Sequence, residues 1–92
     1  MLILATFDLA NADRALFDSY EAKVLPLLAR HGARIEWRVR AADRSSETHL
    51  LHFPDAISLA SYRADPDRLA ASGDWENCGA TSVQIEVESL GI

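Results

Sequence analysis

The chain has 92 residues, 49% hydrophobic and 25% charged, which is typical of one globular domain over residues 1–92 and argues against disorder. The net charge of −5 argues against nucleic acid or an anionic membrane as partner, because both bind basic faces. A single cysteine excludes an internal disulfide framework. With no signal-peptide pattern at the start of the chain, it favours a reducing, cytoplasmic location.

The first part of the chain predicts a strand and then a helix. The apolar run at residues 2–7 is typical of a strand covered on both faces. Apolar residues recur at helical spacing from 16 to 31, which predicts an amphipathic helix closed by Gly32. Pro26 removes a backbone hydrogen bond within it, so we expect the helix to bend or split near Ala22.

Residues 34–40 carry the clearest strand pattern in the sequence. Ile35, Trp37 and Val39 alternate with charged side chains, which predicts one apolar and one charged face. The charged members are Arg34, Glu36, Arg38 and Arg40. We expect the apolar face to pack on the helices and the charged face to lie on the other side of the sheet.

The second half predicts a strand at residues 48–53, a helix at 56–63 and a fresh helical turn that begins at Pro66. Residues 72–80 contain two glycines and are expected to be irregular. Residues 82–88 predict the last strand, with an apolar set opposed by a polar set: Val83, Ile85 and Val87 against Gln84, Glu86 and Glu88.

The element order β-α-β-β-α-β predicts a ferredoxin-like α+β fold, with a four-stranded antiparallel sheet and both helices on one face. The strands at residues 34–40 and 82–88 then form opposite edges. Two copies placed sheet to sheet would bring an arginine-rich edge toward a glutamate-rich edge, which predicts a homodimer. The alternative is a solvated face whose charges only keep the protein soluble.

Two segments resemble a known superfamily. Residues 21–32, which end in Pro-Leu-Leu-x-x-His-Gly, and the run His-Leu-Leu-His-Phe-Pro-Asp at residues 49–55 are similar to the first helix and third strand of the dimeric α/β-barrel proteins. The likeness is to small uncharacterised members, and more distantly to antibiotic-biosynthesis monooxygenases and muconolactone-isomerase-like proteins. It covers nearly the whole chain and implies a ferredoxin-like fold in a dimeric barrel. The matching positions are helix caps and core residues, which carry no catalytic signature.

The polar sheet face offers candidate catalytic residues. If Leu51 faces the helices, His52 lies on the polar face with Glu36 and Arg38. A histidine between a carboxylate and an arginine can move a proton while the arginine holds a developing enolate or carboxylate. The alternative is that these charges only pair at the dimer interface. A slip of the strand by one residue would exchange His52 for His49.

Metal and cofactor sites are not predicted. His49 and His52 are three apart in a strand and point to opposite faces, so both cannot bind one ion. Cys78 has no second ligand at a suitable spacing, and no phosphate-binding loop or nucleophile motif is present. Trp75 either covers the mouth of a pocket or anchors its segment to the core.

Two classes of function therefore stay open. One is a small dimeric barrel that binds a small molecule in the barrel cavity without an identifiable reaction, or that has only a structural role. The alternative is a cofactor-free monooxygenase or isomerase that acts on a small aromatic or enolisable substrate. A roomy, partly apolar cavity with His52 or His49 pointing into it favours the enzyme, and a filled, salt-bridged interior favours the non-enzymatic barrel.

Overall fold

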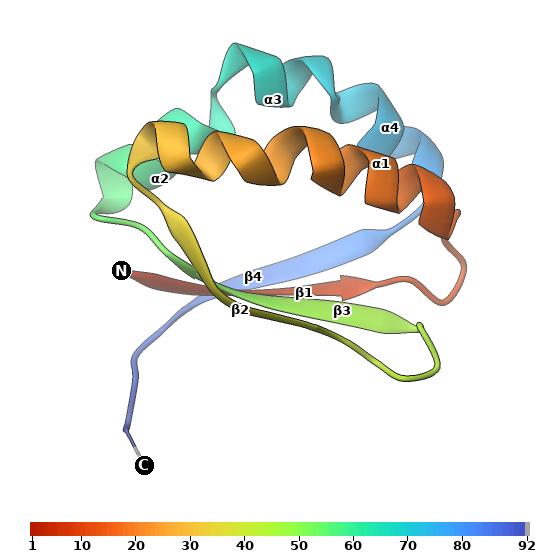
Figure 1. Ribbon diagram of the computed structural model, residues 1–92, viewed down its shortest axis with the longest axis horizontal. Helices are drawn as coiled ribbons and strands as arrows, with labels where there is room; N and C mark the ends of the chain where they lie inside the picture. The colour runs from red at the N-terminus through yellow and green to blue at the C-terminus, as the bar shows by residue number, and fades with distance from the viewer. Residues whose placement is uncertain (92) are drawn as a thin grey trace.

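A computed structural model describes residues 1–91 as one antiparallel sheet with a layer of helices on one face (Figure 1). The elements are β1 (Leu2–Asp8), α1 (Arg14–Val24), the 3₁₀ helix η1 (Leu25–His31), β2 (Arg34–Arg40), β3 (Ser46–His52), α2 (Ala56–Arg63), α3 (Pro66–Ala70), α4 (Ser72–Cys78) and β4 (Thr81–Val87). The strand order β2-β3-β1-β4 confirms the predicted ferredoxin-like α+β fold and its edge strands. None of the helices within residues 1–91 has the length and apolarity needed to cross a bilayer.

The first helix is split at its proline, as predicted, although later in the chain than Ala22. Helix α1 ends at Val24, and the chain continues as η1 with Pro26 in its first turn. A proline costs little there, because the first turn of a helix has no intrahelical partner for its N–H groups. Gly32 follows with φ 70°, the left-handed conformation that ends the helix.

The expectation of an irregular segment at residues 72–80 is wrong, because Ser72–Cys78 forms α4. Trp75 and Cys78, three residues apart on one helical face, are both held by packing. The Trp75 ring lies 5.4 Å from the ring of Tyr20, and Cys78 is buried. This packing outweighs the low helix propensity of Gly73, and Gly79 ends the helix in the left-handed conformation.

A β-bulge at Glu36 exchanges the two faces of β2. Ile35 lies opposite Leu51 and Trp37 lies opposite Leu50, so Glu36 is the extra residue between them. Beyond the bulge, every side chain points to the side opposite to the one that strict alternation predicts. The expectation of charges on the open face is therefore wrong for the second half of β2.

Beyond the bulge, Arg38 lies opposite His49 and Arg40 lies opposite Glu47, on the helix side of the sheet. Trp37 and Val39 point to the open side and are 43% and 55% exposed.

The side chains of β4 also point to the faces opposite to those predicted. Ala5 of β1 is buried under the helices, and its partner Gln84 therefore lies on the helix side. Ile85, opposite Leu4, lies on the open side. The open sheet face is thus mainly apolar rather than charged. Its apolar members are Leu2, Leu4, Trp37, Val39, Leu50, Val83, Ile85 and Val87, and Thr6, Arg34, Thr48 and His52 lie on the same side. The charge complementarity that predicted a homodimer is lost from this face.

The core between sheet and helices is concentrated at the two ends of β1. Ile3 packs with Leu51 and Phe53 in one cluster, and Leu9 packs with Phe17 in another. Between these clusters the sheet presents the small side chain of Ala5 and the polar side chain of His49, which are direct partners. The middle of the sheet is therefore where the interior has room for a polar cluster and a cavity.

Candidate functional site

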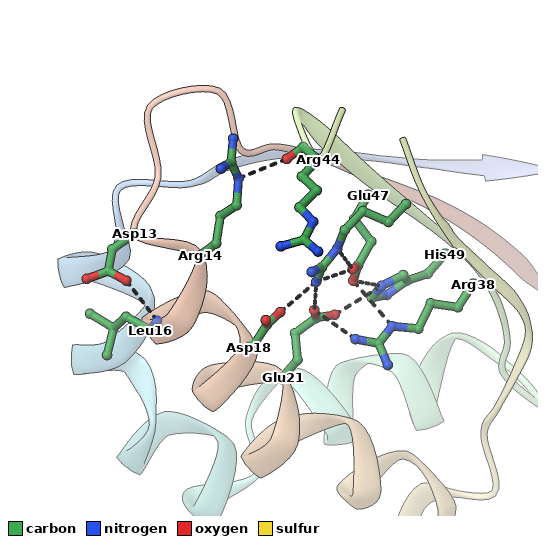
Figure 2. Close-up of polar contacts among 10 residues, drawn as sticks. Asp13, Arg14, Leu16, Asp18, Glu21, Arg38, Arg44, Glu47 and His49 are labelled. Carbon is green, nitrogen blue, oxygen red and sulfur yellow. Dashed lines mark hydrogen bonds and ion pairs between the residues drawn. The ribbon is translucent and has the colours of Figure 1, made fainter. Parts of the chain in front are cut away.

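Six charged or ionisable side chains from three elements meet under the helix layer, and we call them the ion cluster (Figure 2). They are Asp18 and Glu21 of α1, Arg38 and Arg40 of β2, and Glu47 and His49 of β3. The side chains of Glu21, Glu47 and His49 are 4%, 2% and 1% exposed. The two arginines are half-buried at the edge and screen these three groups from solvent.

The buried carboxylates meet at the His49 ring. Its Nε2 lies 2.6 Å from Oε2 of Glu47 and 3.0 Å from Oε2 of Glu21. Arg38 donates to Glu21 at 3.0 Å and to Glu47 at 3.3 Å. Arg40 donates to Glu47 at 2.8 Å and to Asp18 at 2.6 Å. These charge-assisted contacts fix the positions of all three buried groups.

The ion cluster separates the two buried carboxyls in their acidity. Burial raises the pKa of Glu21 above its ordinary value; the contact with His49 opposes this rise and the hydrogen bond to Glu47 adds to it. Burial acts in the same direction on Glu47, but hydrogen bonds from Glu21, His49 and Arg40 outweigh it and lower the pKa of Glu47 to about 2. Glu47 is thus the permanent anion, and Glu21 is the carboxyl that exchanges a proton.

Charge balance gives the ion cluster one mobile proton. Three carboxylates face two guanidinium groups, so a single proton on Glu21, the buried carboxyl whose pKa is raised, makes the cluster neutral. A carboxyl with a raised pKa in contact with a histidine ring is suited to general acid–base chemistry.

The same geometry offers a set of metal-ligand atoms. Glu21, Glu47 and His49 present ligand atoms that all lie within 4.8 Å of one another. Arg38 and Arg40 already neutralise these carboxylates, however, and a divalent cation would add two charges where one proton completes the balance. The donor set therefore suits a proton better than a metal ion.

A cavity of about 280 Å³ lies between the sheet and the helices, and Glu21 and His49 form part of its wall. The rest of its wall is mainly apolar, with the rings of Phe7, Tyr20, Phe53, Tyr62 and Trp75 among aliphatic side chains. Glu21 also lines an open groove on the outside of the molecule, together with Glu47 and the two arginines of the ion cluster. The mobile proton is therefore next to both the cavity and the solvent-facing groove.

The predicted catalytic residues do not form one site. Arg38 lies on the helix side of the sheet within the ion cluster, whereas His52, the partner of Leu2, lies on the open side. Glu36 is the bulge residue and pairs with Arg34 at 2.8 Å. Of the two histidines that the sequence left as alternatives for the open face, His52 is the one that lies there, as expected if Leu51 faces the helices. His49 lines a different cavity, between the sheet and the helices. The catalytic role predicted for His52 stays a prediction.

Sequence reasoning missed Glu21 and Glu47, although both left a signal. Glu21 follows Phe17 by four residues and precedes Val24 by three, so it occupies a core position on the apolar stripe of the helix. The predicted third strand began at residue 48, which left Glu47 out, but the alternation that buries Leu51 also buries Glu47. Trp75, for which two roles were open, both packs in the core and lines the cavity.

Solved structures share this fold. The chain superposes on a cofactor-independent oxygenase, SnoaB of Streptomyces nogalater, with TM-score 0.71 and 15% identity over 96% of this chain and 92% of that one. An uncharacterised NIPSNAP domain protein of Burkholderia xenovorans gives TM-score 0.63 and 17% identity over 100% and 99%. A proposed antibiotic biosynthesis monooxygenase of Deinococcus radiodurans gives 0.73 and 14% over 100% and 98%.

These likenesses confirm the fold that the resemblance of the two sequence segments implied, and at this level of identity they concern the fold alone. No known family profile and no curated protein matches the sequence.

The ion cluster predicts unequal effects for two matched substitutions. Glu47→Gln removes the permanent anion and should lower the free energy of unfolding at neutral pH by about 3 kcal/mol, the low end for a broken buried pair, because Glu21 can ionise in its place. Glu21→Gln replaces a carboxyl that tends to hold a proton and should cost about 1 kcal/mol or less. Urea unfolding of both variants measures the difference, and equal losses would contradict the assignment.

The pH dependence has opposite signs for the two groups. Because the pKa of Glu47 is lowered, its contribution to stability is complete above the unfolded-state value of about 4.3 and is lost as the pH falls toward about 2. Because the pKa of Glu21 is raised in the folded protein, the contribution of Glu21 to stability is complete below the unfolded-state pKa of about 4.3. It is lost as the pH rises from there through the raised folded-state pKa. The Glu21→Gln variant should lack this second loss.

Proposed function

We propose that this protein binds a small, largely apolar molecule in the cavity between its sheet and its helices. The observation that carries the proposal is a cavity of about 280 Å³ whose wall is mainly apolar, with five aromatic rings, and also includes polar side chains. Ligand-binding pockets combine these properties, and a volume just below about 300 Å³ suits a molecule smaller than most drugs. The ligand class that fits is a compact molecule of one or two rings.

A second candidate function is cofactor-free chemistry on an enolisable or aromatic substrate, either monooxygenation or isomerisation. The specific observation in its favour is the contact at the cavity wall between Glu21, whose pKa is raised, and His49, with 3.0 Å between Oε2 of Glu21 and Nε2 of His49. A base there could remove a proton next to a carbonyl group, and the resulting enolate could accept a proton at another atom or react with dioxygen. The fold shared with a cofactor-independent oxygenase supports this candidate.

The proposal includes association of two copies through the open sheet face. Val83 and Ile85 are 68% and 52% exposed at the β4 edge of this face, and Trp37 is 43% exposed at the opposite edge. Leu50 and Leu4 lie between Trp37 and Ile85 across the sheet. A contiguous apolar patch of this kind is rare on monomeric proteins, and a two-fold axis would place it against itself. Because the face is apolar, the attraction would come from burial of hydrophobic surface rather than from the complementary charges predicted earlier.

The two tryptophans allow ligand binding to be observed at the cavity alone. Trp75 lines the cavity, whereas Trp37 lies on the open sheet face. In a Trp37→Phe variant, one-ring and two-ring aromatic compounds should change the fluorescence of Trp75 in a saturable way. The matched Trp75→Phe variant should show no saturable change. If neither variant responds to any compound, or if only Trp37 responds, the cavity is not a binding site.

Proton transfer can be tested without knowledge of the natural substrate. The exchange of the α-hydrogens of 2-tetralone in deuterated buffer, followed by NMR, should be faster with the wild-type protein. His49→Gln should slow the protein-catalysed exchange by about 10²-fold, the usual contribution of a general base. His52→Gln is the matched control on the open face and should keep the wild-type rate.

Loss of exchange with His52→Gln alone would instead support the role predicted for His52. No acceleration by the wild-type protein would dismiss the enzymatic candidate and leave the binding proposal in place.

A further inference from the structure

Two arginines that belong to no ion cluster also line the cavity. They are Arg63 at the end of α2 and Arg68 in α3. Arg63 donates to Oε1 of Gln84 at 3.2 Å. Gln84 and His49 are the two neighbours of Ala5 across the sheet, so they lie two strand spacings apart, which is about 10 Å. The cavity thus has the ion cluster on the side of His49 and a basic side toward β4.

The guanidinium group of Arg68 is held but not neutralised. It lies 5.0 Å from the centre of the Tyr62 ring, and its one hydrogen bond among residues 1–91 is to the backbone oxygen of Arg63 at 3.4 Å. Its Nε is buried and has no hydrogen-bond partner within the described part of the chain. No carboxylate of residues 1–91 pairs with Arg68 or Arg63, in contrast to the two arginines of the ion cluster.

The charge of Arg68 acts on buried groups in the interior of the protein. Burial raises the pKa of the Tyr20 and Tyr62 hydroxyls, and Arg68 opposes this rise at both. Both rings line the cavity, so a ligand there would lie within the field of the same guanidinium group.

A neutral ligand would make the surroundings of the Arg68 guanidinium group less favourable. An apolar molecule that fills the cavity would displace water from Arg68 and supply no counter-charge, which is unfavourable for a partly buried cation. A carboxylate or another delocalised oxyanion would replace that water and can accept two parallel N–H bonds from a guanidinium group.

We infer that Arg68 forms an anion subsite and that the ligand of the cavity is a one-ring or two-ring molecule carrying a carboxylate or a comparable oxyanion. The ring lies against the aromatic wall, with the anion on Arg68 and an exchangeable proton toward His49. This inference rests on the proposed binding function and gives the chemical class of the ligand.

A pair of probes of the same shape tests the subsite: 2-naphthoate and its neutral amide, 2-naphthamide. With Trp75 as reporter in the Trp37→Phe background, the carboxylate should bind at least tenfold more tightly than the amide. Arg68→Met keeps a flexible apolar stem over the Tyr62 ring and should remove this preference. Arg14→Met is the matched control, because Arg14 is exposed on α1 and contacts the backbone oxygen of Arg44.

The outcomes separate this inference from the proposed function. Binding of the amide at least as tight as that of the carboxylate in the otherwise wild-type protein overturns the anion subsite and keeps the binding function. A carboxylate preference that survives Arg68→Met also overturns it, and assigns Arg68 to packing on Tyr62. If the Arg68→Met protein does not fold, the preference measured with Arg68 present still decides the ligand class. Binding of neither probe counts against the cavity as a site.

Discussion

One extra residue in an edge strand determines how this molecule divides its charged and apolar side chains. The bulge at Glu36 turns Arg38 and Arg40 toward the helices and Trp37 and Val39 toward the open face. Without the two guanidinium groups, the carboxylates of Glu21 and Glu47 would be buried with little to compensate them. The same reversal of side-chain direction removes the charges of Arg38 and Arg40 from the open face and makes that face suitable for burial.

The middle of the sheet is where the remaining features meet. Apolar packing is concentrated at the two ends of β1, and between them Ala5 leaves space while His49 supplies a polar group. A cavity results, with aromatic rings on its walls, the ion cluster on one side and arginines on the other. Helices α2, α3 and α4 pass over this region, so the sequence after Pro54 supplies much of the wall as well as the edge strand β4.

The fold could be predicted because it depends on periodic signals within single segments. The order of elements, the split at Pro26 and the closing role of Gly32 all follow from local chemistry. Which way a strand faces depends instead on its neighbours. The alternation from Ile35 to Arg40 looks regular in the sequence, and only the pairing with β3 reveals the extra residue.

The candidate site depends on that same register. For this reason His52, Arg38 and Glu36 were grouped from the sequence, whereas the structure groups Arg38 with His49, Glu21 and Glu47. Helix α4 was missed because packing of Trp75 and Cys78, rather than local propensity, stabilises it.

Sedimentation equilibrium at micromolar concentration tests most directly whether the bulge creates a face that a second copy covers. The wild-type protein should sediment as a dimer. Ile85→Glu on the open face should sediment as a monomer, whereas Ile57→Glu, at a residue of α2 that is 78% exposed, should remain a dimer. A wild-type protein found only as a 10.1 kDa species would contradict the proposal.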